Sequence, residues 1–331
     1  MEGPLWTETH APSLSELPQP SVRDALTRAV DQPMNLVLYG PQGVGKTAAV
    51  RALAREAHDD ETDLVELNVD DFFSRTKTEI KNDPRFESFL VGRSRMSKRD
   101  MINRVLKESA SYAPVSGEYK TVLLDNAEAI REDFQQALRR VMERHHRTTQ
   151  FVIATRQPSK LIPPIRSRCF NVPVREPTHG ETVAVLERVV EAEGVEYDAD
   201  GLEYVAGYAD GDLRRAILGA QTTAEDADEV TMQAAYEALG EVGLTERVEE
   251  MLTAAEAGEF SDARNTLDDL LVDEGYSGQE ILADILAVSR SRRSGRELTA
   301  LHRLAGEVDL DLAEGTSDRI HLGRLLAELG R

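Results

Sequence analysis

The chain has one cysteine in 331 residues, and its apolar runs are all shorter than a membrane span, which needs about 18 residues or more. A single cysteine excludes an internal disulfide bond, which fits a reducing compartment. The first residues carry neither the basic nor the apolar segment of a secretory signal. These absences predict a cytoplasmic protein with no membrane partner.

Lysine is also scarce. The chain has 7 Lys and 32 Arg against 60 acidic residues, which gives a net charge of −21. A surface poor in Lys and rich in acids suits a salt-rich cytoplasm, where screening limits self-repulsion. We therefore expect a halophilic source, with an ordinary acidic mesophilic protein as the alternative. The overall charge also argues against nucleic-acid binding, because DNA-binding proteins usually present a basic face.

The most informative feature that the chain does contain is an apolar stretch followed at once by a glycine-rich loop, G-x-x-x-x-G-K-T. The loop consists of Gly40, Pro41, Gln42, Gly43, Val44, Gly45, Lys46 and Thr47. Glycines at this spacing let backbone N–H groups approach phosphate oxygens, and the helix that follows points its positive end at the same anion. Lys46 can reach the β and γ phosphates, and the Thr47 hydroxyl can ligate Mg²⁺. The motif predicts binding of ATP or GTP.

Short apolar runs alternate with helical patterns in the first half of the chain. The predicted strands are 35–39, 63–67, 121–125, 150–155 and 169–173, and the predicted helices are 47–57, 98–109 and 131–145. This alternation indicates a parallel sheet covered on both faces. After residue 177 the strand signals stop, and the expected helices are 181–192, 198–208, 213–223 and 231–239, followed by a further helical series. We expect an α/β domain over 1–175, a small helical domain over 176–240 and a helical domain over 241–331.

A second nucleotide motif ends the third predicted strand, where four apolar or β-forming residues lead to Asp125. A carboxylate at the end of such a strand holds Mg²⁺, usually through water. Many strands end in Asp, so this motif indicates a nucleotide site only in combination with the glycine-rich loop upstream.

Several motifs resemble those of one family. Asp125-Asn126-Ala127-Glu128 resembles the D-E-A-D box of the clamp-loader ATPases, the replication factor C small subunits of the AAA+ class. Residues 135–143 are similar to the family's Q-x-A-L-R-R-x-M-E helix, 167–169 to its S-R-C box and 211–217 to its G-D-M-R-x-A-I motif. Residues 6–12 resemble W-x-E-K-Y-R-P, and 275–278 and 314–320 resemble the collar domain. The motifs lie in the family's order over almost the whole chain.

The resemblance implies an AAA+ P-loop parallel-sheet domain over 1–175, a helical lid domain over 176–240 and a helical collar over 241–331 that forms oligomers. It implies a subunit that binds ATP and Mg²⁺ and assembles with other clamp-loader subunits. Such a subunit helps to load the sliding clamp onto primer-template DNA during replication.

The resemblance also assigns roles to two arginines. Arg168 would be an arginine finger that stabilises charge on the γ-phosphate bound by the neighbouring subunit. Arg214 would touch the nucleotide in cis and report its state to the lid. The expected catalytic set is therefore Lys46, Asp125, Arg168 and Arg214. The alternatives are an ordinary surface arginine at 168 and a structural ion pair at 214, and Cys169 is expected to be a small buried hydrophobe.

Three departures from the family matter. Asn126 stands where the family has the Glu that polarises the attacking water, and a neutral amide cannot accept a proton. Arg156 stands where the family usually has a polar Asn, and Thr9-His10-Ala11 replaces K-Y-R. We therefore expect nucleotide binding with slow or absent hydrolysis. Compensating residues could restore turnover, and an architectural subunit with a vestigial site is the other alternative. A small-molecule P-loop kinase is disfavoured, because it needs neither Arg168 nor a collar.

Residues 91–107 form a basic segment inside this acidic chain, with six basic residues and one acid. The resemblance places DNA-backbone contacts on helices of this region, and such contacts need only positive charge. The residues expected to contact DNA are Arg93, Arg95, Lys98 and Arg99. The alternative is a solvated loop whose arginines pair with local acids. Residues 83–86 look like an added loop relative to the family.

Overall fold

The structure is a computed structural model that describes residues 4–69, 73, 75–82, 96–239, 244–272, 275–315 and 317–330. The chain forms two compact units, Met1–Ala238 and Leu239–Arg331. The added loop expected at 83–86 lies outside the described residues.

The first unit contains a parallel sheet of five strands in the order β2-β3-β4-β1-β5. The strands are β1 (Leu36–Tyr39), β2 (Leu64–Asn68), β3 (Lys120–Asp125), β4 (Thr149–Thr155) and β5 (Phe170–Pro173). All five strands predicted from the sequence are present, each within one residue at its ends. The central strand β4 is buried over its whole length, as expected for a strand covered on both faces.

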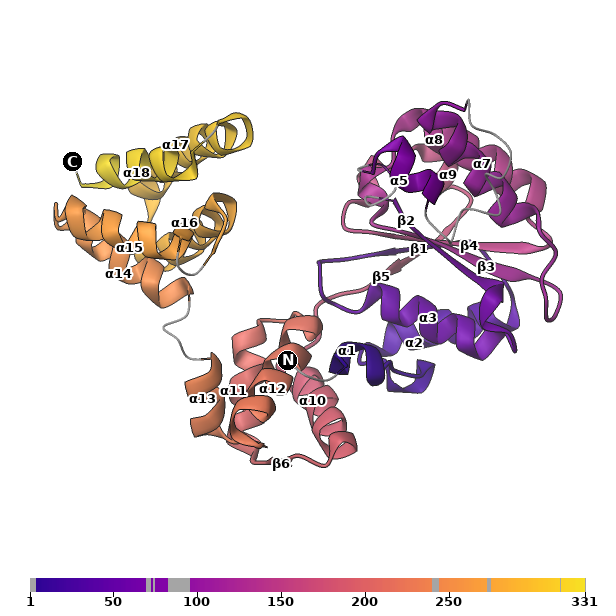
Figure 1. Ribbon diagram of the computed structural model, residues 1–331, viewed down its shortest axis with the longest axis horizontal. Helices are drawn as coiled ribbons and strands as arrows, with labels where there is room; N and C mark the ends of the chain where they lie inside the picture. Colours follow the sequence, from indigo (N-terminus) through magenta and orange to yellow (C-terminus); the bar gives the residue numbers. More distant parts are fainter. Residues whose placement is uncertain are drawn as a thin grey trace. The chain divides into compact units, whose positions relative to one another are not determined.

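Helices cover both faces of this sheet (Figure 1). One face carries α2 (Pro20–Asp31) and α3 (Lys46–Ala57). The other carries α5 (Lys77–Asn82), α7 (Lys98–Ser111), α8 (Glu132–His145) and α9 (Pro163–Arg166). Short helical elements lie between them, namely α1 (Trp6–Thr9), η1 (Leu14–Glu16), η2 (Glu61–Asp63), η3 (Ala127–Ala129) and η4 (Pro158–Lys160).

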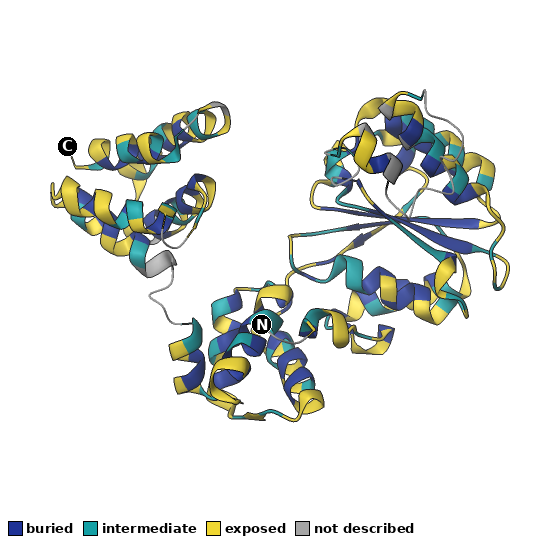
Figure 2. Ribbon diagram, viewed as in Figure 1, coloured by how far each residue is buried: buried dark blue, intermediate teal, exposed yellow. Residues whose placement is uncertain are grey.

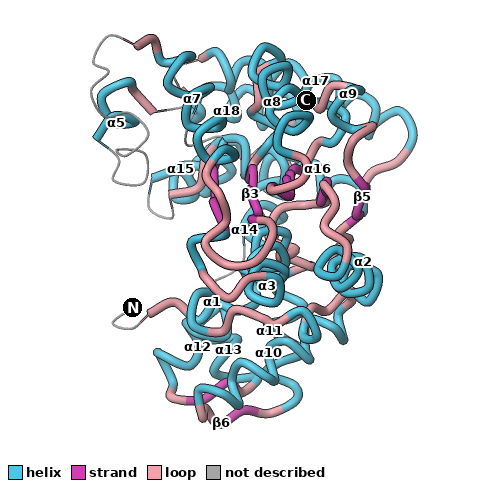
Figure 3. Tube along the Cα trace, turned by 90° about the vertical axis from the view of Figure 1, so that its right-hand side faces the viewer, coloured by secondary structure: helices cyan, strands magenta, loops and turns pink. Residues whose placement is uncertain are grey.

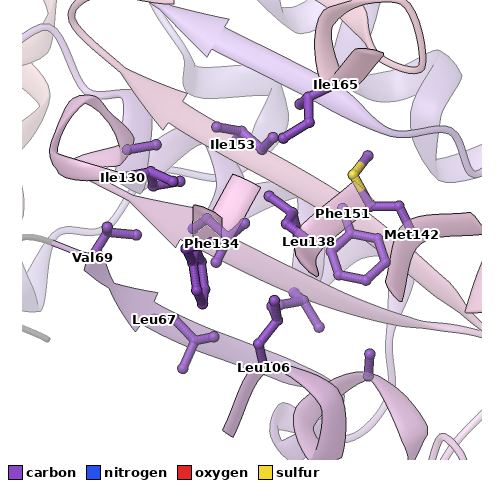
Figure 4. Packing of buried hydrophobic residues seen from close by; sticks show 14 of the residues in the cluster. Leu67, Val69, Leu106, Ile130, Phe134, Leu138, Met142, Phe151, Ile153 and Ile165 are labelled. Atoms are coloured by element: carbon purple, nitrogen blue, oxygen red, sulfur yellow. The ribbon is translucent and has the colours of Figure 1, made fainter. Parts of the chain in front are cut away.

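The alternation of side chains along each strand divides the apolar residues between two cores. Phe151 and Ile153 of β4 belong to one core, whereas Val152 between them belongs to the other. Figure 4 shows the first core, to which α8 contributes residues at i, i+4 and i+8, namely Phe134, Leu138 and Met142. This helical spacing places the three side chains on one face of α8.

The rest of the first unit is mainly helical. Its elements are α10 (His179–Glu193), β6 (Glu196–Tyr197), α11 (Ala199–Ala209), α12 (Leu213–Ala227), β7 (Glu229–Val230) and α13 (Met232–Leu239). Thr178 and Glu181 form a reciprocal capping box at the start of α10. The expectation that strands stop after residue 177 was wrong, because β6 and β7 form a small parallel pair. Two residues are too few to produce a visible alternation of apolar side chains.

The start of the chain packs on this helical part. Trp6 is buried, and its backbone N–H donates to Oε1 of Gln221 on α12 at 2.9 Å. His10 pairs with Glu193 at the end of α10. The W-x-E segment therefore contacts the helices around α12.

The second unit consists of α14 (Leu244–Glu256), α15 (Phe260–Val272), α16 (Gly278–Arg292), α17 (Gly295–Glu314) and α18 (Asp318–Leu329). In its described residues every regular element is a helix (Figure 3). Each helix turns a buried stripe toward a shared core that includes Met251, Leu267, Ile285 and Leu322 (Figure 2). Among all described residues of the chain, no helix is long and apolar enough to cross a membrane.

Candidate nucleotide-binding site

Three neighbouring strands end at the same edge of the sheet and bring the site together. The glycine-rich loop follows β1, Asp125 ends β3, and Arg156 directly follows β4. Because β4 lies between β1 and β3, its last residues stand between the loop and Asp125. Ligands of open parallel sheets bind at this carboxyl edge.

The loop needs its glycines for two different reasons. A Cβ on Gly40 would lie 1.9 Å from the backbone oxygen of Val174, so only glycine fits beside that strand end. Gly43 and Gly45 have φ angles of 73° and 92°, in the left-handed region that favours glycine. Gly45 is also the N-cap of α3, so the first N–H groups of this helix follow the loop directly.

Lys46 folds back over the loop. Its Nζ donates to the backbone oxygen of Gly40 at 2.9 Å and also to that of Pro41. Burial lowers the pKa of Lys46, and the carboxylates of Asp125 and Glu128 oppose this shift. A partly desolvated ammonium held at the loop is suited to bind a phosphate anion.

The structure brings the two predicted magnesium ligands into contact. Thr47 Oγ1 donates to Asp125 Oδ2 at 2.7 Å, and the Asp125 Oδ1 accepts from the backbone N–H of Asn126 at 2.9 Å. Hydroxyl and carboxylate oxygens are ligands that Mg²⁺ prefers, and Mg²⁺ usually keeps several waters beside one or two carboxylates. The described residues accordingly contain no cluster of three or more His, Cys, Asp or Glu side chains that could hold a metal alone.

Asn126 places an amide directly after Asp125, at the position where the sequence resemblance predicts a carboxylate. Its backbone is left-handed, with φ 52°, and its Nδ2 donates to Asn68 Oδ1 at 3.2 Å. Asn is among the few residues that tolerate this conformation. The amide is thus directed to the end of β2 and offers no proton acceptor comparable to a carboxylate.

Both carboxylate oxygens of nearby Glu128 are engaged in hydrogen bonds. It accepts from Thr155 Oγ1 at 3.0 Å, from the backbone N–H of Arg156 at 3.1 Å and from Arg156 Nε at 2.6 Å. Burial alone would raise the pKa of Glu128, but the hydrogen bonds from Arg156 and Thr155 hold it below its ordinary value. A carboxylate stabilised in this way is a poor general base.

Sequence reasoning named Arg156 only as a departure and missed what it contacts. Besides Glu128, it reaches the glycine-rich loop, where its Nη1 donates to Gln42 Oε1 at 3.3 Å. Arg156 directly follows β4, the strand between β1 and β3, and this position in the sequence could have indicated that its side chain lies at the site.

The start of α12 reaches the loop from the helical part of the unit. Asp212, the N-cap of α12, accepts from the backbone N–H of Arg215, and a Cβ built on Gly43 would lie 1.9–2.1 Å from its carboxylate atoms. Asp212 therefore lies directly against the loop. Arg214 in the first turn of α12 is exposed, and its side chain makes no hydrogen bond or ion pair with the residues described.

Arg168 contacts other elements. It follows α9, and its guanidinium donates to Glu143 Oε1 of α8 at 2.6 Å and to the Pro164 backbone oxygen at 2.7 Å. Its described bonds involve none of the loop residues. Burial raises the pKa of the neighbouring Cys169 thiol to about 12, which keeps it protonated at neutral pH.

The structure describes only part of the basic segment. Arg93 and Arg95 lie outside the described residues, and Lys98 is the first residue of α7. Arg99 is exposed, and its Nε lies 3.1 Å from Asp133 Oδ2. This ion pair is of the kind expected for a solvated segment with local pairing.

The parallel sheet, the glycine-rich loop and the Thr47–Asp125 contact define a P-loop nucleotide-binding protein. Residues 36–175 match the ATPase family associated with various cellular activities (AAA), and residues 244–328 match the replication factor C C-terminal domain.

The replication factor C small subunit of Halobacterium salinarum is 32% identical, with 98% of this chain and 95% of the relative covered. That of Methanocella arvoryzae is also 32% identical, with 98% and 96% covered. The chain belongs to the replication factor C small-subunit family.

Among solved structures, the Aeropyrum pernix Orc1 protein in complex with DNA has a TM-score of 0.53 at 18% identity, with 96% of each chain covered. The Thermotoga maritima RuvB Holliday junction branch migration motor has a TM-score of 0.54 at 16% identity, with 76% of this chain and 84% of that chain covered. At these identities the likeness shows the fold alone. The predicted fold class, a P-loop sheet domain followed by helical domains, is confirmed.

Proposed function

We propose that this chain is an ATP- and Mg²⁺-binding subunit of a sliding-clamp loader. It assembles with other loader subunits and helps to place the ring clamp on primer-template DNA. The observation that carries the proposal is the contact between Thr47 and Asp125 beside a complete phosphate loop, in a chain that matches the family over 98% of its length.

The site supports binding better than hydrolysis. Membership of the AAA family gives the chain an ATPase fold, but Asn126 lacks a carboxylate and Glu128 is held by Arg156. We propose that the isolated subunit turns over ATP slowly. Arg214 then contacts the bound nucleotide in cis, from its exposed place in the first turn of α12.

We propose that Arg168 acts in trans on the nucleotide of a neighbouring subunit. Its side chain is 38% exposed and held by Glu143 and Pro164, so it is both accessible and oriented. The residues predicted to contact DNA (Arg93, Arg95, Lys98 and Arg99) remain part of this proposal, with Arg99 exchanging Asp133 for a DNA phosphate.

A salt-rich cytoplasm is the proposed environment, because 60 acidic residues and only 7 Lys need screening. If so, the free energy of unfolding should rise with KCl concentration over the molar range. A chain most stable in dilute buffer would contradict this assignment.

The test of the proposed function is reconstitution with the partner subunits co-purified from native-salt lysate. ATP-dependent loading of the clamp on primed DNA is measured for the wild type, for Asn126→Glu and for the surface control Asn171→Asp. We expect Asn126→Glu to raise ATP turnover of the assembly, because it restores the missing carboxylate, and the control to leave it unchanged. Rapid turnover by the isolated wild type, without DNA, would show that the site has been misread.

An architectural subunit with a vestigial site is the second candidate. It is favoured by one observation, the carboxylate of Asp212 that lies where an anion would approach Gly43. Calorimetry distinguishes the two candidates, because a vestigial site binds no ATP in Mg²⁺ and molar KCl.

A further inference from the structure

A second concentration of arginines lies in the second unit, where α16 ends and α17 begins. Residues 241–331 contain 20 acidic residues, 10 Arg and no Lys, so this part of the chain is acidic as a whole. Residues 290–303 nevertheless hold half of these arginines and a single acid, Glu297. We call the five arginines the arginine patch; they are Arg290, Arg292, Arg293, Arg296 and Arg303. The patch is a local reversal of charge in an acidic unit.

Two members of the patch, Arg292 and Arg293, have a structural role. Arg293 Nη2 lies 2.5 Å from Glu256 Oε1 of α14, and Arg292 Nη2 lies 3.9 Å from Glu256 Oε2. Arg292 also donates to the backbone oxygen of Glu249 at 3.3 Å and to Thr253 Oγ1 at 3.0 Å. These contacts fasten the end of α16 to α14 and so fix the position of the turn into α17.

The other three members, Arg290, Arg296 and Arg303, have no such role. All three are exposed, and their side chains make no hydrogen bond or ion pair with the residues that the structure describes. The arginines of this unit that are paired with an acidic side chain outside the patch are Arg247, Arg264, Arg319 and Arg324. Three free guanidinium groups in a unit with a twofold excess of acids are therefore not explained by pairing within the chain.

Helix stability does not explain the position of Arg296. It lies in the first turn of α17, where the helix dipole favours acids and disfavours a cation. Arg303 follows seven residues later, which is nearly two full turns, so the two arginines share one face of the helix. The opposite face carries Leu301, Ala305 and Val308, which are buried in the core of the unit. The two arginines therefore point away from the core, beside the end of α16, which packs against α17 (Figure 1).

The chemistry of the patch fits phosphate groups better than a protein surface. A stable protein interface usually has an apolar centre. Residues 290–303 contain no Phe, Tyr or Trp, and the exposed large apolar residues of this unit lie elsewhere, at Phe260, Val272, Leu310 and Ile320. Guanidinium groups match the geometry of phosphate, and without aromatic side chains the patch offers bases no stacking surface.

The spacing of the arginines also fits a nucleic-acid backbone. Arg296 and Arg303 are about 10 Å apart along the helix axis, at 1.5 Å for each residue. This distance corresponds to about three nucleotides of one DNA strand, at 3.4 Å each. A surface of this kind contacts phosphates and does not read the base sequence.

We propose that the arginine patch is a DNA-backbone site on the second unit, additional to the basic segment at 91–107. Arg290, Arg296 and Arg303 contact the phosphates, and Arg292 and Arg293 hold the turn that presents them. The site goes beyond the proposed function, which assigns DNA contacts to the basic segment alone, and rests on it only in that DNA is the ligand. It gives the loader a second contact with DNA, independent of base sequence and weakened by salt.

The first experiment measures the affinity of the assembled loader for a fluorescein-labelled DNA duplex by anisotropy, across a KCl series. The test variant is Arg290→Gln/Arg296→Gln/Arg303→Gln, and Arg290→Lys/Arg296→Lys/Arg303→Lys keeps the charge. The matched control is Arg264→Gln/Arg319→Gln/Arg324→Gln, which makes the same charge change in the same unit at arginines that are paired with acids. Urea unfolding of each chain shows that the variants remain folded.

We expect the slope of log affinity against log salt concentration to fall by roughly 0.9 for each phosphate that is no longer neutralised, and so by about 2.7 in the Gln test variant. The Lys variant should keep the slope of the wild type, because nonspecific phosphate contacts need only positive charge. The control should keep it as well. An unchanged slope in the Gln test variant, or an equal fall in the control, would overturn the proposal.

The second experiment locates the contact. Ala300 is exposed on α17 between Arg296 and Arg303, and Ala313 is exposed about 20 Å further along the same helix. With p-benzoylphenylalanine in place of Ala300, irradiation of the assembly should cross-link the DNA, and with the same amino acid in place of Ala313 it should not. A cross-link from position 300 to another loader subunit in place of DNA would show a protein interface and overturn the proposal.

The two experiments also separate this proposal from the proposed function. A wild-type assembly that binds no DNA at any salt concentration would contradict both. An assembly that loads the clamp, but whose Gln test variant binds DNA with the slope of the wild type, would overturn only the site on the second unit.

Discussion

Removal of the Lys46 ammonium should weaken ATP binding much more than it changes folding. The Lys46→Ala substitution deletes a charged donor at the phosphate loop, and hydrogen bonds to charged groups contribute roughly 1.5–3 kcal/mol. At about 1.4 kcal/mol per factor of ten, the dissociation constant for ATP should rise about 10- to 140-fold.

The effect of this substitution on the empty protein has two opposed parts. Lys46 donates to the backbone oxygens of Gly40 and Pro41, and because the donor is charged, loss of each bond costs roughly 1.5–3 kcal/mol. Against this, burial of the ammonium disfavours its charged form, as the lowered pKa of Lys46 shows, and the substitution removes that penalty. We expect a net change in the free energy of unfolding of about 1 kcal/mol or less, from opposing terms of this size.

The assay is isothermal titration calorimetry with Mg²⁺ and ATP in molar KCl, alongside thermal unfolding without nucleotide. Lys160→Ala is the matched control, because Lys160 is exposed on η4. A Lys46→Ala variant that binds ATP within twofold of the wild type would refute the reasoning, provided that the wild type binds. A variant that fails to fold would show that the lysine is chiefly structural.

Four other predictions concern separate parts of the molecule. Arg168→Ala should leave this subunit's own ATP affinity unchanged and lower hydrolysis at the neighbouring site by a factor of about 10³. If only the variant's own site loses activity in mixed complexes, a role of Arg168 in trans is contradicted. Glu128→Gln should lower the free energy of unfolding at neutral pH, and the difference from the wild type should shrink as the pH falls. The reason is that the pKa of Glu128 in the folded chain lies below its ordinary 4.5, so the carboxylate stabilises the fold above that value and loses this contribution on acidification. Acid titration of both proteins, followed by circular dichroism, measures this difference. Leu138→Ala should lower the free energy of unfolding by about 2–5 kcal/mol, measured by urea titration, because Leu138 is fully buried between α8 and the sheet. Replacing the basic residues Arg93, Arg95, Lys98 and Arg99 with neutral ones should weaken the salt dependence of DNA binding by the assembled loader. The slope of log affinity against log salt concentration should fall by roughly 0.9 for each phosphate that is no longer neutralised. An unchanged slope would show that the segment is only a solvated loop.

The main sheet could be predicted from the sequence because its strands are buried on both faces. Continuous apolar runs such as residues 150–155 have few other stable environments, so their ends were located within one residue. The pair β6 and β7 was missed, because two residues carry no periodicity and their pairing depends on the helices between them.

Some contacts of the site could likewise be predicted from the sequence, and others could not. The Thr47–Asp125 contact follows from two local motifs and from the rule that parallel strands end at one edge. The bond from Arg156 to Gln42 and the approach of Asp212 to Gly43 depend on side chains from separate elements, and local sequence patterns do not encode them. The slow hydrolysis expected from Asn126 stays a prediction, which rests on the chemical difference between an amide and a carboxylate.

Because Asp212 lies against the phosphate loop, the affinity for nucleotide depends on the position of α12, and the position of α12 depends on bound nucleotide. The carboxylate that caps α12 lies against Gly43, so a phosphate anion entering the loop meets a like charge there. An interaction that moves the Asp212 carboxylate away from the loop while Arg214 stays close to it should therefore tighten nucleotide binding, and by thermodynamic reciprocity nucleotide strengthens that interaction by the same factor. The backbone N–H of Trp6 donates a hydrogen bond to Gln221 on this same helix, so the start of the chain is one of the segments whose contacts with α12 enter this equilibrium.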